Sequence, residues 1–208
     1  MARLSVLTAA VAAISAISVS AQAQFAHLVL QSDQGDFIGQ GQTVDDWYTP
    51  GGGDSFSAQI RRSLAGGAPA ELLFVLGSSL NQPNDFALLF FGTDQLGIPM
   101  QTGSYTDAQR ADFAGPGHPG LDVSFQNRGS NTLTGSFNVT DFTYDFDQAT
   151  STYTILTFKA DFIQHSEGAD PALHGTFTYN AVPEPASIAV LGMGALALIR
   201  RRRKSESK

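Results

Sequence analysis

The sequence contains no cysteine among its 208 residues. A disulfide framework and a zinc site built on thiolates are therefore excluded, and the folded chain must be stabilised by burial of apolar surface. Residues 24–181 provide that surface, because all 15 phenylalanines and all 5 tyrosines of the chain lie in this segment. The sequence thus predicts a body with a sizeable hydrophobic core between two terminal segments of different composition.

Positive charge is also scarce in the body. Residues 24–181 contain five basic and 17 acidic side chains, a net charge of about −12, whereas the whole chain carries −7 because a basic cluster lies near its C-terminus. Nucleic acids and anionic lipids are poor partners for so acidic a surface. Divalent cations and neutral or cationic polymers suit it better, so no nucleic-acid partner is predicted.

Common catalytic signatures are missing as well. The sequence has no Gly-x-Ser-x-Gly elbow, no Walker loop and no His-Glu-x-x-His helix. The body has only two glutamates, Glu71 and Glu167, but many aspartates, and the carboxylate separation that matters for glycoside hydrolysis is spatial. The sequence therefore predicts a non-catalytic binding or structural module, with a secreted carbohydrate-active enzyme using paired carboxylates as the alternative.

The N-terminal segment 1–23 has the pattern of a secretory signal peptide. Arg3 precedes an uncharged run over residues 4–20, and the small residues Ala21 and Ala23 stand where signal peptidase requires them. We expect export of the chain and cleavage after Ala23, which would leave Gln24 as the first mature residue.

The C-terminal segment contains a short apolar run. Residues 186–199 are 14 residues without a charge, which as a helix would cover about 21 Å of a hydrocarbon core that is roughly 30 Å thick. A basic cluster follows and would stay on the cytoplasmic side of the inner membrane. We therefore expect a short transmembrane helix that serves as a transient anchor. The basic cluster consists of Arg200, Arg201, Arg202, Arg203 and Lys204.

Immediately before this run lies Val182-Pro183-Glu184-Pro185, in which the prolines exclude helix and favour an extended chain open to a protease. The motif, the apolar run and the basic cluster, over residues 182–208, resemble the PEP-CTERM sorting signal of exported Gram-negative bacterial proteins. The resemblance implies recognition by an exosortase, removal of the tail, and a final location at the cell surface or outside the cell. An ordinary single-span anchor with a Pro-rich linker is the alternative interpretation.

The body is rich in short apolar runs separated by Gly, Pro, Asn and Asp, which is typical of strands and turns. We predict one all-β domain over residues 24–181, an antiparallel two-sheet sandwich of jelly-roll type. Residues 36–43 are among the predicted strands, and residues 105–113 form the one modest helix candidate.

The phase of the apolar alternation shifts within two of the predicted strands. In residues 133–146 the apolar positions change parity near Thr140, and in residues 153–163 they change between Ile155 and Leu156. A β-bulge absorbs one residue and restores the burial of one face. In residues 121–125 the alternation is regular and predicts that Asp122 faces water.

Three segments of the body, residues 35–41, 128–131 and 160–168, resemble parts of an uncharacterised β-rich module of exported bacterial proteins. The resemblance places cysteines of that module at the positions of Ser130 and Ser166. It implies that these two serines lie close together, and it suggests contact with extracellular polysaccharide. It implies a fold and not a reaction.

Trp47 and Tyr48 precede a proline and three glycines and stand beside two aspartates. Such a pair could present an aromatic platform to a sugar ring, while the alternative is that both are core aromatics beside a flexible loop. Trp47 and Tyr48 are therefore the candidate ligand platform of the sequence.

No metal ligand set and no cofactor are predicted. The densest cluster of possible ligands matches no metal signature, and a solvated loop explains it as well. Three aspartates of one strand could offer oxygen ligands to Ca²⁺, although the spacing of an EF-hand loop is missing and acidic strand residues also discourage aggregation. The first cluster is His165, Glu167, Asp170 and His174, and the aspartates are Asp141, Asp145 and Asp147.

Overall fold

The computed structural model describes residues 24–50, 53–78 and 86–181, which form one compact unit. The predicted signal peptide with Ala21 and Ala23, the sorting motif Val182–Pro185 and the C-terminal basic cluster lie outside the described residues. Among the described residues, none forms a helix with the length and apolar character needed to cross a membrane.

The regular secondary structure of the described part of the chain is almost entirely β, as predicted. It contains ten strands and two short 3-10 helices, η1 (Asp94–Leu96) and η2 (Ala111–Phe113). The strands are β1 (Phe25–Ser32), β2 (Thr43–Tyr48), β3 (Asp54–Ser63), β4 (Pro69–Ser78), β5 (Phe86–Gly92), β6 (Gly103–Arg110), β7 (Gly120–Phe125), β8 (Leu133–Asp147), β9 (Thr152–Ser166) and β10 (Ala172–Asn180).

All ten strands belong to one hydrogen-bonded sheet in the order β2-β1-β10-β9-β8-β6-β7-β5-β4-β3. The pairs are antiparallel except for β6 and β7, which pair in parallel at Gln109–Gly120 and Arg110–Leu121. The structure therefore differs from the predicted pair of separate antiparallel sheets. The short parallel contact joins what would be two sheets into one mixed sheet.

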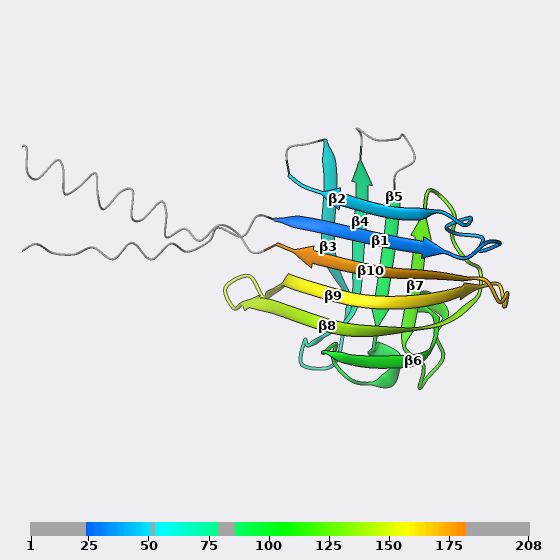
Figure 1. The fold of residues 1–208 in the computed structure, drawn as a ribbon. Coiled ribbons are helices and arrows are strands. Elements are labelled where there is room, and N and C mark those ends of the chain that lie inside the picture. Colours follow the sequence, from blue (N-terminus) through cyan, green and yellow to red (C-terminus); the bar gives the residue numbers. More distant parts are fainter. Residues whose placement is uncertain (1–23, 51–52, 79–85, 182–208) are drawn as a thin grey trace, which may run out of the picture. The chain divides into compact units, whose positions relative to one another are not determined.

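The two halves of this sheet pack face to face around an aromatic core. Figure 1 shows β1, β10, β9 and β8 crossing in front of β3, β4 and β5. The ring centroid of Phe74 on β4 lies 4.8 Å from Phe177 on β10 and 4.9 Å from Phe158 on β9, and Phe91 on β5 lies 5.0 Å from Phe158. We call the half formed by β2, β1, β10, β9, β8 and β6 the front layer.

Both predicted phase shifts are present in the long β8–β9 hairpin. The pairing register shifts between Val139 and Asp141, which skips Thr140, and again between Thr143 and Tyr144, opposite Leu156. Each shift lets one residue bulge. Phe142 after the first bulge still packs against the core, and Ile155 and Phe158 on either side of the second are buried, whereas Tyr144 and Phe146 near the hairpin end are exposed.

Two predicted elements were wrong. Residues 105–113 form most of β6 followed by η2 rather than a helix, because β6 finds partners in β8 and β7. Residues 36–43 are mainly turns rather than a strand. The Asp36 carboxylate accepts hydrogen bonds from the backbone N–H groups of Ile38 and Gly39 and from the Ser32 hydroxyl, and this local satisfaction of the backbone competes with strand pairing.

Candidate functional site

An exposed aromatic group lies on the outer face of the front layer, where β1 pairs with the edge strand β2. Trp47 is 55% exposed although it is the largest side chain of the body. Its ring stacks on the imidazole of His27, its direct cross-strand partner, with centroids 3.9 Å apart and planes at 13°. The Phe25 ring lies 5.3 Å away, so three aromatic rings form one surface.

A carboxylate borders these rings. Asp45 precedes Trp47 by two residues, so the pleat places both on the same face of β2. Its Oδ1 lies 2.7 Å from His27 Nε2, and 68% of its side chain is exposed. An aromatic ring beside a carboxylate provides stacking and a hydrogen-bond acceptor together, which is the chemistry that recognises a sugar ring. We call Phe25, His27, Asp45 and Trp47 the Trp47 surface.

The predicted pairing of Trp47 with Tyr48 was wrong. Tyr48 is only 1% exposed and belongs to the hydrophobic core. Successive residues of a strand point to opposite faces, so two adjacent aromatics cannot form one platform. His27 and Phe25 replace Tyr48, and the sequence does not reveal them because the register between β1 and β2 is a property of the fold.

Asp46 lies on the other face of β2 from Asp45. Burial raises the pKa of the Asp46 carboxyl, and the negative charges of Asp45 and Asp54 raise it further, while His27 opposes the shift. Negative charge is thus concentrated where β2 ends and β3 begins. This acidic environment favours a neutral or cationic ligand near Trp47.

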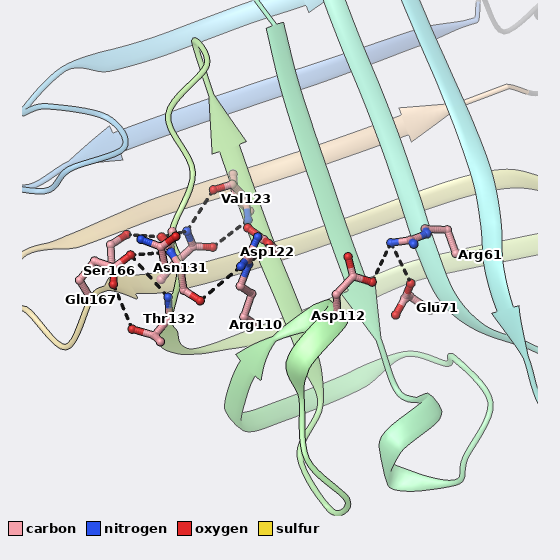
Figure 2. Close-up of polar contacts among 12 residues, drawn as sticks. Arg61, Glu71, Arg110, Asp112, Asp122, Val123, Asn131, Thr132, Ser166 and Glu167 are labelled. Atoms are coloured by element: carbon pink, nitrogen blue, oxygen red, sulfur yellow. Dashed lines mark hydrogen bonds and ion pairs between the residues drawn. The ribbon is translucent and has the colours of Figure 1, made fainter.

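A second group of carboxylates lies on the other half of the sheet and is engaged by two arginines. Glu71 on β4 has no exposed surface, and its Oε2 lies 2.5 Å from Arg62 Nη1 while its Oε1 lies 3.5 Å from Arg61 Nη1. Arg62 Nη1 also lies 3.3 Å from Asp94. Arg61 contacts Asp112 at 3.1 Å, as Figure 2 shows. Burial raises the pKa of Glu71, which the Arg62 guanidinium opposes.

These carboxylates are a charge network of the sheet rather than a free acid pair. Glu71 and Asp94 approach the same guanidinium nitrogen, so they lie close together, but each is held by Arg62. Hollows in the described part of the chain include three at β6/β8/β9, at β1/β9/β10, and near the ends of β1 and β10. Their linings contain Asp161 or Asp54 but no carboxylate pair.

The predicted proximity of Ser130 and Ser166 is confirmed. Their hydroxyl oxygens lie 2.7 Å apart and both residues are buried. Gln164, which has no exposed surface, accepts a hydrogen bond from the Val123 N–H at 2.8 Å and donates to the Val123 carbonyl at 3.0 Å. This interior network joins β7, the β7–β8 loop and β9.

Two charged contacts surround that network (Figure 2). Glu167 accepts hydrogen bonds from the backbone N–H of Asn131 at 2.5 Å and from the Thr132 hydroxyl at 3.2 Å, and the Asn131 bond in particular lowers its pKa. Asp122 is buried and contacts Arg110 Nε at 3.0 Å. The prediction that Asp122 faces water was wrong, because Arg110 on β6 provides it with a partner.

The Ser130–Ser166 contact leads to a stability prediction. We expect the double variant Ser130→Cys/Ser166→Cys to form a disulfide under oxidising conditions, because the hydroxyl oxygens are already in contact. Closing a loop whose ends are 36 residues apart should raise the free energy of unfolding by about 2–4 kcal/mol. Urea denaturation with and without reductant measures the gain, with single Ser130→Cys as the control. Free thiols in the oxidised double variant, detected by mass spectrometry, would contradict the prediction.

The side chains weighed in the sequence as possible metal ligands do not converge. Within the described ranges, no group of three or more His, Asp or Glu side chains is arranged to hold a metal ion. His165 Nδ1 contacts the backbone oxygen of Asp170, and His174 contacts Asp33. Asp145 and Asp147 accept hydrogen bonds from the backbone of Phe146 and Ala149, so they order the β8–β9 hairpin.

Comparison with protein families identifies one match, the PEP-CTERM protein-sorting motif at residues 181–204. No curated protein and no solved structure matches the chain. The match covers the proline-containing motif, the apolar run and the basic cluster together. The chain therefore carries a PEP-CTERM protein-sorting motif, the signal of proteins that exosortase-type processing sorts to the cell surface.

Proposed function

We propose that the body of this exported protein is a non-catalytic module that binds extracellular polysaccharide at the Trp47 surface. In this account the signal peptide delivers the chain, the short C-terminal helix anchors it in the inner membrane, and an exosortase removes the tail. The body then remains at the cell surface or in the surrounding matrix.

The exposed Trp47 ring carries this proposal. A large aromatic side chain that is 55% exposed on a sheet face leaves much of its apolar surface in water. His27 stacks on it and Phe25 lies beside it, so the ring has an aromatic support. Asp45 adds an exposed acceptor, and the net charge of the body disfavours acidic ligands.

The alternative of a secreted carbohydrate-active enzyme has weaker support. Hydrolysis of a glycosidic bond needs two carboxyl groups roughly 5–10 Å apart with access to substrate. The close acids Glu71 and Asp94 are held by Arg62, and neither lines any of the three hollows described above. A binding role requires only the surface that Trp47 provides.

Removing the Trp47 ring tests the binding proposal. We expect the body, residues 24–181, to bind at least one neutral or amine-bearing polysaccharide, and Trp47→Ala to weaken that binding at least about tenfold, because stacking on an aromatic surface is lost. Phe113→Ala is the matched control, since Phe113 is an exposed aromatic in η2, which follows β6 at the opposite edge of the front layer from β2. Affinity electrophoresis in polysaccharide gels measures both variants. Absence of binding to every polymer would contradict the proposal.

The sorting step is tested in the exporting host. We expect Glu184→Ala in the full chain to leave a membrane-associated precursor, because the substitution removes the charge between the two prolines of the motif. Glu206→Ala is the matched control, since Glu206 lies beyond residues 181–204. Mass spectrometry of the membrane and extracellular fractions measures the C-terminus of each product. Normal tail removal in Glu184→Ala would contradict recognition through this residue.

A further inference from the structure

A continuous row of side chains crosses the whole front layer on the face that carries Trp47. Each member is the direct register partner of the next, from the edge strand β2 to β6. Five of the six are polar. The row consists of Asp45, Val29, Thr176, Asp161, Asn138 and Ser104. We call it the cross-strand row.

Hydrogen bonds within the cross-strand row orient its polar groups. The Thr176 hydroxyl donates to Asp161 Oδ1 at 2.6 Å, and the Ser104 hydroxyl donates to the Asn138 Oδ1 at 2.8 Å. Asp161 is exposed, so its second carboxylate oxygen and the Asn138 amide nitrogen can serve a ligand. The row therefore offers both acceptors and donors at fixed positions.

Two hollows of about 280 Å³ each lie along the row. Both are lined by Asp161 and Ile163 of β9; one extends to Val29 and Thr176, and the other to Ser104 and Asn138. The outer face is thus indented on both sides of β9. Polar exposed side chains alone are usual on such a sheet face. The two shallow hollows add a feature of shape, because both follow the same register row.

The charge of the row restricts its ligand. It contains two carboxylates and neither lysine nor arginine. Arg61, Arg62 and Arg110 are paired with carboxylates elsewhere, and Arg128 donates to the Ile38 carbonyl. Lys159 on β9 is exposed two residues from Asp161 on the same face, so one cation flanks the two carboxylates of the row. A polymer bearing carboxylate or sulfate groups would still meet a net negative charge along the row.

From these observations we infer that an extended polysaccharide chain without acidic groups lies across the strands, along the cross-strand row, with one end against Trp47. This inference rests on the proposed function and adds the direction, length and charge of the ligand. Since neighbouring strands are about 4.8 Å apart, six strands span about 24 Å, the length of roughly five sugar residues. Affinity should therefore rise with chain length up to about five residues and then level off.

The experiment measures binding of residues 24–181, a segment that contains all described strands and their core. Polysaccharide gels of β-1,4-glucan, xylan, chitosan and alginate first identify a polymer that is bound, and calorimetry then uses its oligomers of two to eight residues. Asp161→Asn and Asn138→Ala are the test variants, in the row but distant from Trp47. Asp145→Asn is the control, because it changes the net charge equally on the exposed β8–β9 hairpin. Thermal denaturation checks that each variant is folded.

We expect Asp161→Asn to weaken binding of a five-residue oligomer about tenfold, with a smaller effect of Asn138→Ala and no effect on a two-residue oligomer. Asp145→Asn should leave both unchanged. Binding that depends on Trp47 but not on oligomer length or on Asp161 would overturn this inference and leave the proposed function standing. Preference for alginate would also overturn it, while binding to no polymer would overturn both.

Discussion

Replacing Gln164 with leucine should lower the free energy of unfolding by about 4 kcal/mol, because two buried backbone groups would lose their partners at once. The Gln164 amide bonds to both the N–H and the carbonyl of Val123. On its other edge β7 pairs with β5, while its parallel contact with β6 ends at Leu121. The Gln164 side chain therefore replaces the hydrogen bonds that a neighbouring strand would make to Val123 on this edge of β7.

Urea denaturation of Gln164→Leu measures this loss, with Gln148→Leu as the matched control on the exposed hairpin turn. The control should change stability by less than about 0.5 kcal/mol. Gln164→Glu adds a second comparison, since it keeps an acceptor for the Val123 N–H but places a carboxylate against the Val123 carbonyl. A loss below about 1 kcal/mol in Gln164→Leu would show that Val123 does not depend on this amide.

The burial of Gln164 could be predicted from the sequence, but its partner could not. Phe158, Ala160 and Phe162 share one face of the strand predicted over residues 153–163, and continuing the period of two one residue beyond it places Gln164 on that face as well. A polar residue at a core position signals a hydrogen-bond network. The partner Val123 lies 41 positions away in the other half of the sheet, and no local pattern encodes that approach.

The fold likewise has local features that the sequence predicts and long-range pairings that it does not. The bulges near Thr140 and Leu156 could be predicted, because a shift in apolar parity within one strand is a local signal. The single mixed sheet could not, since it depends on pairings between distant segments such as β1 with β10 and on the parallel contact of β6 with β7. The predicted helix at 105–113 was wrong for this reason, as partner strands decide its conformation.

Strand register determines which residues of the candidate site can be identified from the sequence. Trp47 could be selected because a lone tryptophan beside aspartates and a glycine-rich loop is recognisable. Its partner His27 and the cross-strand row could not, because they arise from five successive strand pairings. Ser130 and Ser166 were placed together by resemblance, which carries information about tertiary contacts that composition lacks.

Replacing Arg62 with alanine should lower the free energy of unfolding by about 3 kcal/mol at pH 8, because the fully buried Glu71 carboxylate would lose its closest counterion. The loss should be smaller than for a completely buried pair, since Arg62 is itself partly exposed and Arg61 remains 3.5 Å from Glu71. The double variant Arg62→Ala/Glu71→Gln should recover most of the loss, because no uncompensated charge then remains. No recovery would show that Arg62 contributes through packing alone.

The pH dependence of this variant provides an independent test. Burial already raises the pKa of Glu71 above its ordinary value of 4.5, and Arg62 opposes the shift, so its removal should raise that pKa further. The folded state then holds a proton that the unfolded state releases near pH 4.5, and this contribution to stability disappears as the pH rises through the folded pKa. The deficit of Arg62→Ala should therefore be largest above that pKa and shrink as the pH falls towards 4.5. Urea denaturation of both proteins at pH 5 and pH 8 measures it, and an equal deficit at both values would mean that Glu71 ionisation does not cause the loss.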